Sequence, residues 1–386
     1  MRIVIFTHPA FTEHQSMPRY ANMLANGLRM RGHSVTIYSP GAYFTKIPAP
    51  GFLKKWLGYI DQYLIFPAAI KKRIKRLDHT LYVFSDHALG MWVPLVKHLP
   101  HVIICHDFLA QRSAAGEIPQ NRTSWYGRIY QQLIRKGYSQ GKNFISVSKN
   151  TQRDLHRFLG FVPPLSKVLY NGLNKNLKKL DANKSRQIIN EKTGADVLRG
   201  YILHVGGNQW YKNRLGVVKI YNTWRAMFGN TLPLLLVGSS PAPRLRQAVE
   251  ASPYRNDIFL PGIIPDEYIN AAYSGASVLL FPSFAEGFGW PVAEAMACGC
   301  PVITTDQAPM TEVGGSAAIY IPVQPLHASA ITGWAEESAK TLNKIIIMSD
   351  LQRINLINKG LDNSKKFNTD KALESAEKIF GEIWNG

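Results

Sequence analysis

Short apolar segments that alternate with helical patterns run through this chain in two successive series, and this alternation limits the possible folds more than any other feature. In the first series, segments of strand type lie at residues 2–6, 34–38, 81–85, 101–107, 143–148 and 167–173. Helical spacing of apolar residues separates most of them, as where Tyr20, Leu24 and Leu28 recur after Pro18. Strands that alternate with helices predict a parallel, doubly wound α/β sheet.

A second series of the same kind follows a polar, lysine-rich stretch at residues 174–187, whose composition is that of a linker. Its strand segments lie at 201–207, 232–238, 257–262, 277–283, 301–306 and 318–322, with helices expected near 212–228, 243–250, 266–275 and 291–298. A chain of 386 residues is also too long for one ordinary core. We therefore predict two Rossmann-like domains, at 1–185 and 190–365, and a helical tail at 366–386.

Composition places the chain among globular proteins, with 46% hydrophobic and 18% charged residues. No apolar run approaches the roughly 18 residues of a membrane span, and the first residues lack the pattern of a signal peptide. The three cysteines, Cys105, Cys298 and Cys300, are too few for a disulfide framework, and no second ligand cluster near Cys298 and Cys300 favours zinc. These features predict a cytoplasmic location.

The net charge of +19 is concentrated in one half of the chain. Residues 1–190 hold 28 Lys and Arg against 8 Asp and Glu, whereas residues 191–386 hold 17 against 18. Such an imbalance indicates an anionic partner for the first half, either nucleic acid or an acidic membrane surface. A merely soluble basic domain is the alternative. No helix-turn-helix, zinc-finger or RNA-recognition pattern supports a nucleic-acid-binding protein.

Residues 52–76 combine apolar and aromatic residues at helical spacing with a dense set of basic residues. This pattern suits the surface of an anionic membrane, although a buried helix with a solvated basic end has the same pattern. The residues that we assign to a membrane or acceptor surface are Lys54, Lys55, Trp56, Lys71, Lys72 and Arg73.

Ligands of open α/β sheets bind beyond the carboxyl ends of the strands, so the loop after the segment 277–283 is a candidate site. There Glu286 precedes Pro291, which can begin a helix, and Glu294 lies within that helix. The two carboxylates, about 10 Å apart at roughly 1.5 Å per helical residue, could hold two hydroxyl-rich groups of one ligand. Spacing alone leaves open a helix-dipole role for Glu286 and a salt bridge for Glu294.

The stretch FPSFAEGFGWPVAEAMACGCPVITTD, residues 281–306, closely resembles the glutamate-x7-glutamate signature of glycosyltransferase family 4, which are retaining enzymes of the GT-B fold. Similar resemblances occur at YILHVGGNQWYKN (201–213), DIFLPGIIPDEYINAAYSGASVLLFPS (257–283) and SVSKNTQRDL (146–155). VLYNGLN (168–174) and the tail FNTDKALESAEKIFGEIW (367–384) extend the resemblance to essentially the whole chain. It implies two Rossmann-like domains that face each other across a cleft, the first binding the acceptor and the second the nucleotide-sugar, with a tail helix that crosses back to the first.

The resemblance also implies a role for each residue of the signature. Glu286 would hold hydroxyls of the donor sugar, and the backbone of Gly287, Phe288 and Gly289 would line that sugar. Glu294 would bind the ribose hydroxyls of the nucleotide.

Three further positions follow from the resemblance. Lys212 falls where the family lysine contacts the diphosphate, in a loop that includes Gly206, and His106 matches the histidine beside the donor sugar. A core histidine beside Cys105 is the alternative for His106. Gly207 stands where the family usually has an arginine, and either Arg214 or Asn208 could replace it. The first strand–helix loop, HPAFTEHQSMPRY (8–20), also lacks the usual pair of glycines.

Together these implications predict a retaining hexosyltransferase that takes its sugar from a GDP- or UDP-linked donor. The acceptor would be a hydroxyl of a glycan or lipid-linked glycan, in the synthesis of a cell-surface polysaccharide or glycolipid at the inner membrane face. Since no Asp-x-Asp motif follows a strand, we expect neither a metal nor another cofactor. A GT-B nucleotide-sugar epimerase is the alternative within this fold. The lack of G-x-G-x-x-G after the first strand of either half disfavours an NAD oxidoreductase.

Overall fold

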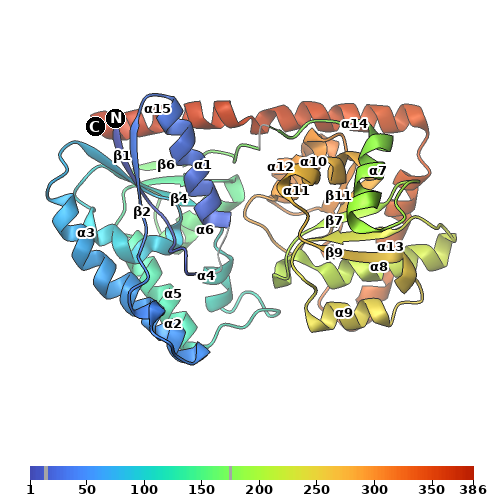
Figure 1. The fold of residues 1–386 in the computed structure, drawn as a ribbon, viewed down its shortest axis with the longest axis horizontal. Helices are drawn as coiled ribbons and strands as arrows, with labels where there is room; N and C mark the ends of the chain where they lie inside the picture. Colours follow the sequence, from blue (N-terminus) through green and yellow to red (C-terminus); the bar gives the residue numbers. More distant parts are fainter. Residues whose placement is uncertain (13–15, 174–175) are drawn as a thin grey trace. The chain divides into compact units, whose positions relative to one another are not determined.

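The computed structural model describes residues 1–12, 16–173 and 176–386, which form two compact units (Figure 1). The first unit consists of residues 1–172 and 370–386, and the second of residues 173–369. Each unit contains one six-stranded sheet in which every neighbouring pair of strands is parallel. The predicted fold class, two doubly wound parallel sheets, is confirmed.

The sheet of the first unit follows the order β2-β1-β3-β4-β5-β6. This is the flavodoxin-like arrangement with one added strand, and its order reverses between β1 and β3. The strands are β1 (Arg2–Phe6), β2 (Ser34–Tyr38), β3 (Thr80–Phe84), β4 (His101–Cys105), β5 (Asn143–Ser146) and β6 (Leu165–Val168). The first five match the predicted segments to within two residues at each end, whereas β6 shares only residues 167 and 168 with the segment predicted at 167–173.

Most helices of this unit bury one apolar face, whereas the helix at residues 51–60 is largely exposed. Side chains cap several of them: Ser124 accepts a hydrogen bond from the Gly127 backbone, and Ser148 accepts one from Thr151. The helices are α1 (Ser16–Met30), α2 (Gly51–Ile60), α3 (Phe66–Ile74), α4 (Leu109–Ala114), α5 (Trp125–Tyr138), α6 (Lys149–Leu159) and α15 (Thr369–Asn385). Shorter helical segments are η1 (Phe44–Lys46), the π-helical η2 (Asp61–Ile65) and η3 (His87–Leu95).

Helix α15 belongs to the first unit although it follows the whole of the second in sequence. Glu377 of α15 pairs with the Arg31 guanidinium at 3.1 Å and with His33 Nε2 at 2.7 Å. Both partners lie in the turn between α1 and β2, so these contacts hold α15 beside α1 (Figure 1).

The sheet of the second unit follows the order β12-β11-β10-β7-β8-β9, which is the Rossmann order with its reversal between β7 and β10. Its strands are β7 (Ile202–Val205), β8 (Leu234–Val237), β9 (Ile258–Gly262), β10 (Val278–Phe281), β11 (Val302–Thr305) and β12 (Ile319–Ile321). The helices are α7 (Ala182–Thr193), α8 (Arg214–Phe228), α9 (Pro243–Glu250), α10 (Asp266–Gly275), α11 (Trp290–Ala297), α12 (Met310–Gly314), α13 (Ala328–Ile346) and α14 (Asp350–Ser364). The short segments η4 (Trp210–Lys212), η5 (Arg255–Asp257), η6 (Gly315–Ala317) and η7 (Lys365–Phe367) connect them.

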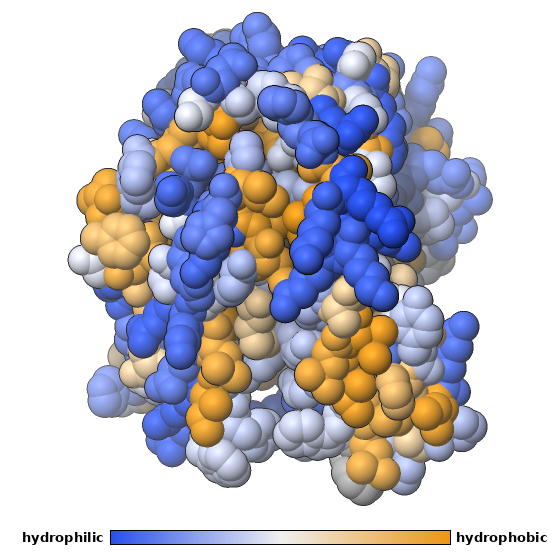
Figure 2. Space-filling view, turned by 90° about the vertical axis from the view of Figure 1, so that its left-hand side faces the viewer, coloured by the Kyte–Doolittle hydropathy of each residue, from blue (hydrophilic) through white to orange (hydrophobic). Residues whose placement is uncertain are grey.

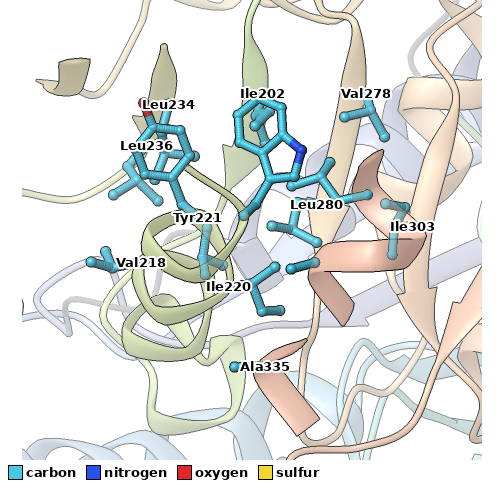
Figure 3. Packing of buried hydrophobic residues seen from close by; sticks show 14 of the residues in the cluster. Ile202, Val218, Ile220, Tyr221, Leu234, Leu236, Val278, Leu280, Ile303 and Ala335 are labelled. Atoms are coloured by element: carbon cyan, nitrogen blue, oxygen red, sulfur yellow. The ribbon is translucent and has the colours of Figure 1, made fainter. Parts of the chain in front are cut away.

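The core of the second unit joins the strands to α8 and α13 (Figure 3). Ile202, Leu234 and Leu280 from three neighbouring strands are fully buried against Ile220 and Tyr221 of α8. This continuous apolar packing fixes the sheet and, with it, the positions of the loops that leave its carboxyl edge.

The prediction of a linker over residues 174–187 is wrong for residues 182–187, which form the first half of α7. Asp181 caps this helix by accepting a hydrogen bond from the Lys184 backbone at 2.8 Å, and Arg186 Nε donates to the Gly275 carbonyl at 3.0 Å. The helix buries only a narrow side that contains Ser185 and Ile189, so its composition resembles that of a polar linker. Residues 174 and 175, like residues 13–15 of the first strand–helix loop, lie outside the described residues.

Candidate active site

The loops that follow β7 and β10 meet at the point where the strand order of the second sheet reverses. Loops at such a point form the ligand-binding crevice of open α/β sheets. Two hydrogen bonds tie these loops together: the Phe284 backbone donates to the Tyr211 carbonyl at 2.8 Å, and Asn213 Nδ2 donates to the Pro282 carbonyl at 3.0 Å.

Lys212 and Glu286, predicted to act on neighbouring parts of one ligand, form an ion pair across these loops. Lys212 Nζ lies 2.8 Å from Glu286 Oε1, and the side chains are only 15% and 8% exposed. The ammonium also lies 5.0 Å from the centre of the Phe281 ring. Because an ammonium has three N–H donors, Lys212 can bind Glu286 and a second anionic group together.

Helix α11 begins at the end of the β10 loop, as its sequence predicts. Gly289 precedes the helix with a φ of +96°, and a Cβ atom there would lie 2.2 Å from Met310 Cε. Pro291 occupies the first turn of the helix, where its missing N–H costs nothing. Phe288 is buried, with its ring edge-on to Phe367 at 5.4 Å. Substrate lining by Gly287, Phe288 and Gly289 stays a prediction.

Glu294, one turn into α11, accepts a hydrogen bond at 2.7 Å from the hydroxyl of Tyr273, which is fully buried in α10. Burial raises the pKa of the Glu294 carboxyl, and the Tyr273 hydrogen bond and the Lys212 charge oppose this rise. Tyr273, which the sequence analysis missed, therefore orients the second glutamate of the signature. Its signal was a tyrosine within the otherwise small-residue stretch NAAYSGA.

Arg214 and Asn208, the two candidates for the missing family arginine, contact each other. Arg214 Nη1 donates to Asn208 Oδ1 at 2.8 Å and to the Ser239 carbonyl at 3.0 Å. Asn208 Nδ2 donates in turn to the Ser240 carbonyl at 2.6 Å. The two side chains thus join the loops after β7 and β8. No acidic side chain pairs with Arg214 within the described part of the chain, and its guanidinium is buried.

The loops after β7 and β8 also approach each other through their backbones. Gly238 has a φ of +141°, and a Cβ atom there would lie 1.9 Å from the Gly206 carbonyl oxygen. Only a glycine fits at residue 238, so the loop after β8 packs directly against the backbone of Gly206 and holds it in position. The adjacent Gly207 carries no side chain, and the replacement of the family arginine by Arg214 or Asn208 stays a prediction.

His204 lies under this loop and was not predicted. It is fully buried in β7, and its Nδ1 atom bonds to the Leu280 carbonyl at 2.9 Å. Burial lowers its pKa to about 3, with smaller contributions from the Arg214 and Lys212 charges. Its Nε2 atom has no hydrogen-bond partner among the residues described and lies 3.1 Å from where a Cβ of Gly206 would be. A histidine within the apolar strand YILHV was the available signal.

His106, the predicted reaction-centre histidine, lies at the end of β4 in the first unit. Its Nε2 atom is 2.9 Å from the Ser85 carbonyl, and its ring packs edge-on against Tyr20 at 4.6 Å. Burial lowers its pKa. Nearby, Asp86 pairs with His8 Nε2 at 2.9 Å and with His87 Nδ1 at 3.0 Å. These groups gather at the carboxyl ends of β1, β3 and β4, where the first sheet reverses its order.

The remaining predictions concern the cysteines, a metal ion and the membrane. Cys105, Cys298 and Cys300 are buried free thiols. Within residues 1–12, 16–173 and 176–386, no group of three His, Cys, Asp or Glu side chains is placed to hold a metal ion. None of the helices formed by those residues combines the length and apolar composition needed to cross a bilayer. The predicted membrane or acceptor residues are exposed on α2 and α3: Lys54, Lys55, Trp56, Lys71, Lys72 and Arg73.

Two family models match the chain, one for each sheet. The model described as Glycosyltransferase Family 4 matches residues 17–177, and the model described as Glycosyl transferases group 1 matches residues 199–335. The chain belongs to glycosyltransferase family 4. The resemblance identified from the glutamate signature is therefore confirmed.

Relatives of this family 4 chain include two named mannosyltransferases. O-antigen chain mannosyltransferase B of Escherichia coli is 34% identical over 123 residues, which are 31% of this chain and 32% of that protein. O-antigen chain mannosyltransferase RfbU of Salmonella typhimurium is 25% identical over 189 residues, 49% of each chain. The chain thus spans about a third to a half of the length of these relatives.

Among solved structures, sucrose-phosphate synthase from Thermosynechococcus elongatus matches 100% of this chain and 99% of its own with a TM-score of 0.75. At 18% sequence identity, this similarity concerns the fold. It confirms that the family 4 chain has the GT-B type of fold that its sequence predicts.

Proposed function

We propose that this chain is a retaining glycosyltransferase that moves a hexose from a nucleotide-sugar to a hydroxyl of a glycan or lipid-linked glycan. The observation that carries the proposal is the Lys212–Glu286 pair, which lies with Glu294 at the switch point of a Rossmann-ordered sheet. A cation and two carboxylates at this place suit a ligand with both a diphosphate and vicinal hydroxyls. Family membership and the named relatives support the same class of reaction.

In the proposed complex, Glu286 accepts hydrogen bonds from hydroxyls of the sugar, while Glu294 accepts them from the ribose. Tyr273 occupies only one lone pair of the Glu294 carboxylate, which has others to offer. Lys212 binds the diphosphate with the N–H donors that Glu286 leaves. Charge from Lys212 and from the first turn of α11 replaces a metal ion, so the reaction needs no cofactor.

The proposed chemistry begins when the bond between the anomeric carbon and the diphosphate oxygen loosens, with its electron pair going to that oxygen. Lys212 stabilises the negative charge that develops there. The acceptor oxygen forms its bond on the face that the diphosphate leaves, and its proton passes to the departing phosphate. The anomeric configuration is therefore retained. We assign His106 to the sugar side of this reaction.

We propose mannose as the sugar, carried by GDP or UDP, because two relatives of this chain are named O-antigen chain mannosyltransferases. Their names also support an acceptor in cell-surface polysaccharide or glycolipid synthesis. We further propose that the enzyme works in the cytoplasm and reaches a lipid-linked acceptor at the inner membrane face.

A thermal-shift panel of GDP-, UDP- and ADP-linked sugars tests the donor site. We expect one nucleotide class to stabilise the wild type and to lose this effect in Glu294→Ala. If no nucleotide-sugar stabilises the wild type, the proposed function is wrong. The donor found in this way is then used to measure transfer, with the anomeric configuration of the product read by NMR.

A further inference from the structure

Helices α2 and α5 lie side by side on the surface of the first unit, joined by aromatic contacts. Tyr59 of α2 stacks on Tyr130 of α5 with ring centres 5.5 Å apart, and the Tyr63 and Tyr130 hydroxyls are 2.6 Å apart. The Lys55 ammonium lies between the Tyr59 and Tyr126 rings, 5.9 and 5.7 Å from their centres. The two helices therefore present one continuous surface rather than two separate ones.

Large apolar side chains on this surface point to solvent. Trp125 is 74% exposed and Trp56 is 61% exposed. Contiguous apolar patches of this kind are rare on proteins that only face water. The exposed residues of the patch are Leu53 and Trp56 on α2, and Trp125, Tyr126, Ile129 and Leu133 on α5.

A turn next to α2 enlarges the apolar surface. The Asp61 carboxylate accepts hydrogen bonds from the backbones of Tyr43, Phe44 and Thr45 at 2.9 to 3.1 Å. These bonds fix the turn while its Tyr43 and Ile47 side chains remain 65% and 49% exposed. Asp61, the only acidic residue in α2, η2 and α3, is itself buried by this arrangement.

A shallow apolar hollow of about 260 Å³ continues the patch at Leu133. Apolar and aromatic side chains form most of its wall, and Lys136 provides a charge there. The side chains involved include Tyr63, Pro67, Met91, Trp92, Leu133 and Lys136.

The exposed charges on the helices beside the patch are all positive. Helices α2, α3 and α5 contain no acidic residue. Their exposed basic residues make no ion pair with an acidic side chain of the described chain. Figure 2 views the side of the first unit that carries α2 and α3, and it shows hydrophobic patches between strongly hydrophilic side chains. The basic residues of these helices are Lys54, Lys55, Lys71, Lys72, Arg73, Arg128, Arg135 and Lys136, and the exposed Arg122 shortly precedes α5.

We propose that α2, α5 and the turn at residues 43–47 form one docking face for an anionic lipid bilayer. The indole and aliphatic side chains enter the boundary between headgroups and acyl chains, and the surrounding basic side chains pair with lipid phosphates. Charge complementarity selects this partner, because a protein or a second copy of this positively charged face would need acidic groups to match it. The proposal rests on the proposed function only in its purpose, which is to bring the enzyme to a lipid-linked acceptor.

The structure extends the surface predicted from residues 52–76 in a specific way. Helix α5, about 70 residues later, contributes the most exposed indole, Trp125, and half of the apolar patch. The docking face therefore depends on both helices, and substitutions on α5 alone weaken membrane binding.

Co-sedimentation of the full chain with lipid vesicles tests this proposal. We expect binding to vesicles of phosphatidylcholine with 30% phosphatidylglycerol, little binding to pure phosphatidylcholine, and loss of binding at high salt. The variant Trp125→Ala/Ile129→Ala, confined to α5, should weaken binding about tenfold or more. Neutralising Lys54, Arg128 and Arg135 to Gln should weaken it roughly 100-fold at low salt.

Matched controls lie on the second unit, where Leu351 and Ile354 are 79% and 55% exposed on α14. The variant Leu351→Ala/Ile354→Ala should bind vesicles as the wild type does. Four results would each overturn the proposal. The protein could bind both vesicle types equally well, or bind neither. The control variant could lose as much vesicle binding as the α5 variant, or the protein could self-associate through Trp125 without binding vesicles. Stabilisation by nucleotide-sugars, measured without vesicles, should be unchanged in the α5 variant. If nucleotide-sugars did not stabilise the wild type, that result would count against the proposed function alone.

Discussion

Lys212 Nζ lies 2.8 Å from Glu286 Oε1, and together these side chains place one positive and one negative charge in a largely buried site. A buried ion pair contributes little net stability, but the loss of one partner leaves the other charge unpaired. Substitution of one partner should therefore lower both stability and activity, whereas substitution of both should lower activity alone.

Lys212→Met should lower the transfer rate by about 10²–10³-fold, because the leaving diphosphate loses its cation. The same change should lower the free energy of unfolding by roughly 1–3 kcal/mol, since Glu286 remains buried without its partner. Lys212→Met/Glu286→Gln should regain most of that stability and none of the activity. Urea unfolding and a transfer assay measure the two quantities. Activity in Lys212→Met above a tenth of the wild-type value would contradict the assigned role.

Glu294→Gln should remove one contribution to the pH dependence of the free energy of unfolding. The folded-state pKa of Glu294 is raised by burial, so the folded protein holds this proton more tightly than the unfolded chain does. The stabilising contribution is full below the ordinary carboxyl pKa of 4.5 and is lost as pH rises through the raised pKa. The difference in unfolding free energy between wild type and variant should therefore change with pH across that window and be constant outside it.

Affinity for the donor should show the opposite trend at the same residue. The ionised Glu294 carboxylate accepts ribose hydrogen bonds more strongly than the neutral form, so wild-type affinity should rise with pH through the raised pKa. A nucleotide-sugar is the suitable probe because its diphosphate does not titrate in this range. Calorimetry with the 2′-deoxy analogue is the control, and a flat profile in the wild type would contradict a ribose-binding role.

Arg214→Met should weaken binding of the nucleoside diphosphate about tenfold while affecting the monophosphate less. The buried guanidinium joins the loops after β7 and β8, and no acidic side chain of the described residues neutralises it. Its charge therefore favours a β-phosphate at that loop. Arg214→Lys keeps the charge without the forked hydrogen bonds, so its affinity for the diphosphate should lie between those of the wild type and Arg214→Met. Equal losses for mono- and diphosphate would indicate only a structural effect on the loop.

His204→Phe should protect the protein against acid. The pKa of His204 is lowered to about 3, so between that value and its ordinary 6.5 the unfolded chain binds a proton that the folded protein does not. Its stabilising contribution is present at neutral pH and falls as pH falls below 6.5. At pH 4.5 the wild type should lose roughly 2–3 kcal/mol that the variant keeps. Urea unfolding of both proteins at pH 7.5 and 4.5 measures this, and equal losses would contradict it.

The central strands β1, β3, β4, β7, β8, β10 and β11 were predicted closely because most of their residues form short, buried apolar runs. The strand β6 (LSKV) has no fully buried residue, and the predicted segment 167–173 overlaps it at residues 167 and 168 alone. The prediction of a linker was wrong at α7 because this helix buries only one narrow side, so its composition is as polar as that of a linker. The sequence around the glutamate signature predicted the turn at Gly289 and the helix that carries Glu294, because glycine and proline determine the backbone there locally.

Residues from separate elements could not be placed in this way. Tyr273 contacts Glu294 of α11, and His204 lies beside the Gly206 loop. These contacts form only when the sheet has folded, so the sequence did not reveal them. The sequence alone offered no way to choose between Asn208 and Arg214, whose side chains are hydrogen-bonded to each other in the structure. Helix α5 was likewise missed as a partner of α2, since about 70 residues separate the two aromatic stretches.

The membership of α15 in the first unit has a consequence for biosynthesis. Residues 173–369 form one uninterrupted segment, so the ribosome delivers the complete second unit before it makes Glu377, the partner of Arg31 and His33. Domains generally fold as units during synthesis. The first unit, although it begins the chain, therefore cannot complete its fold until α15 has been made.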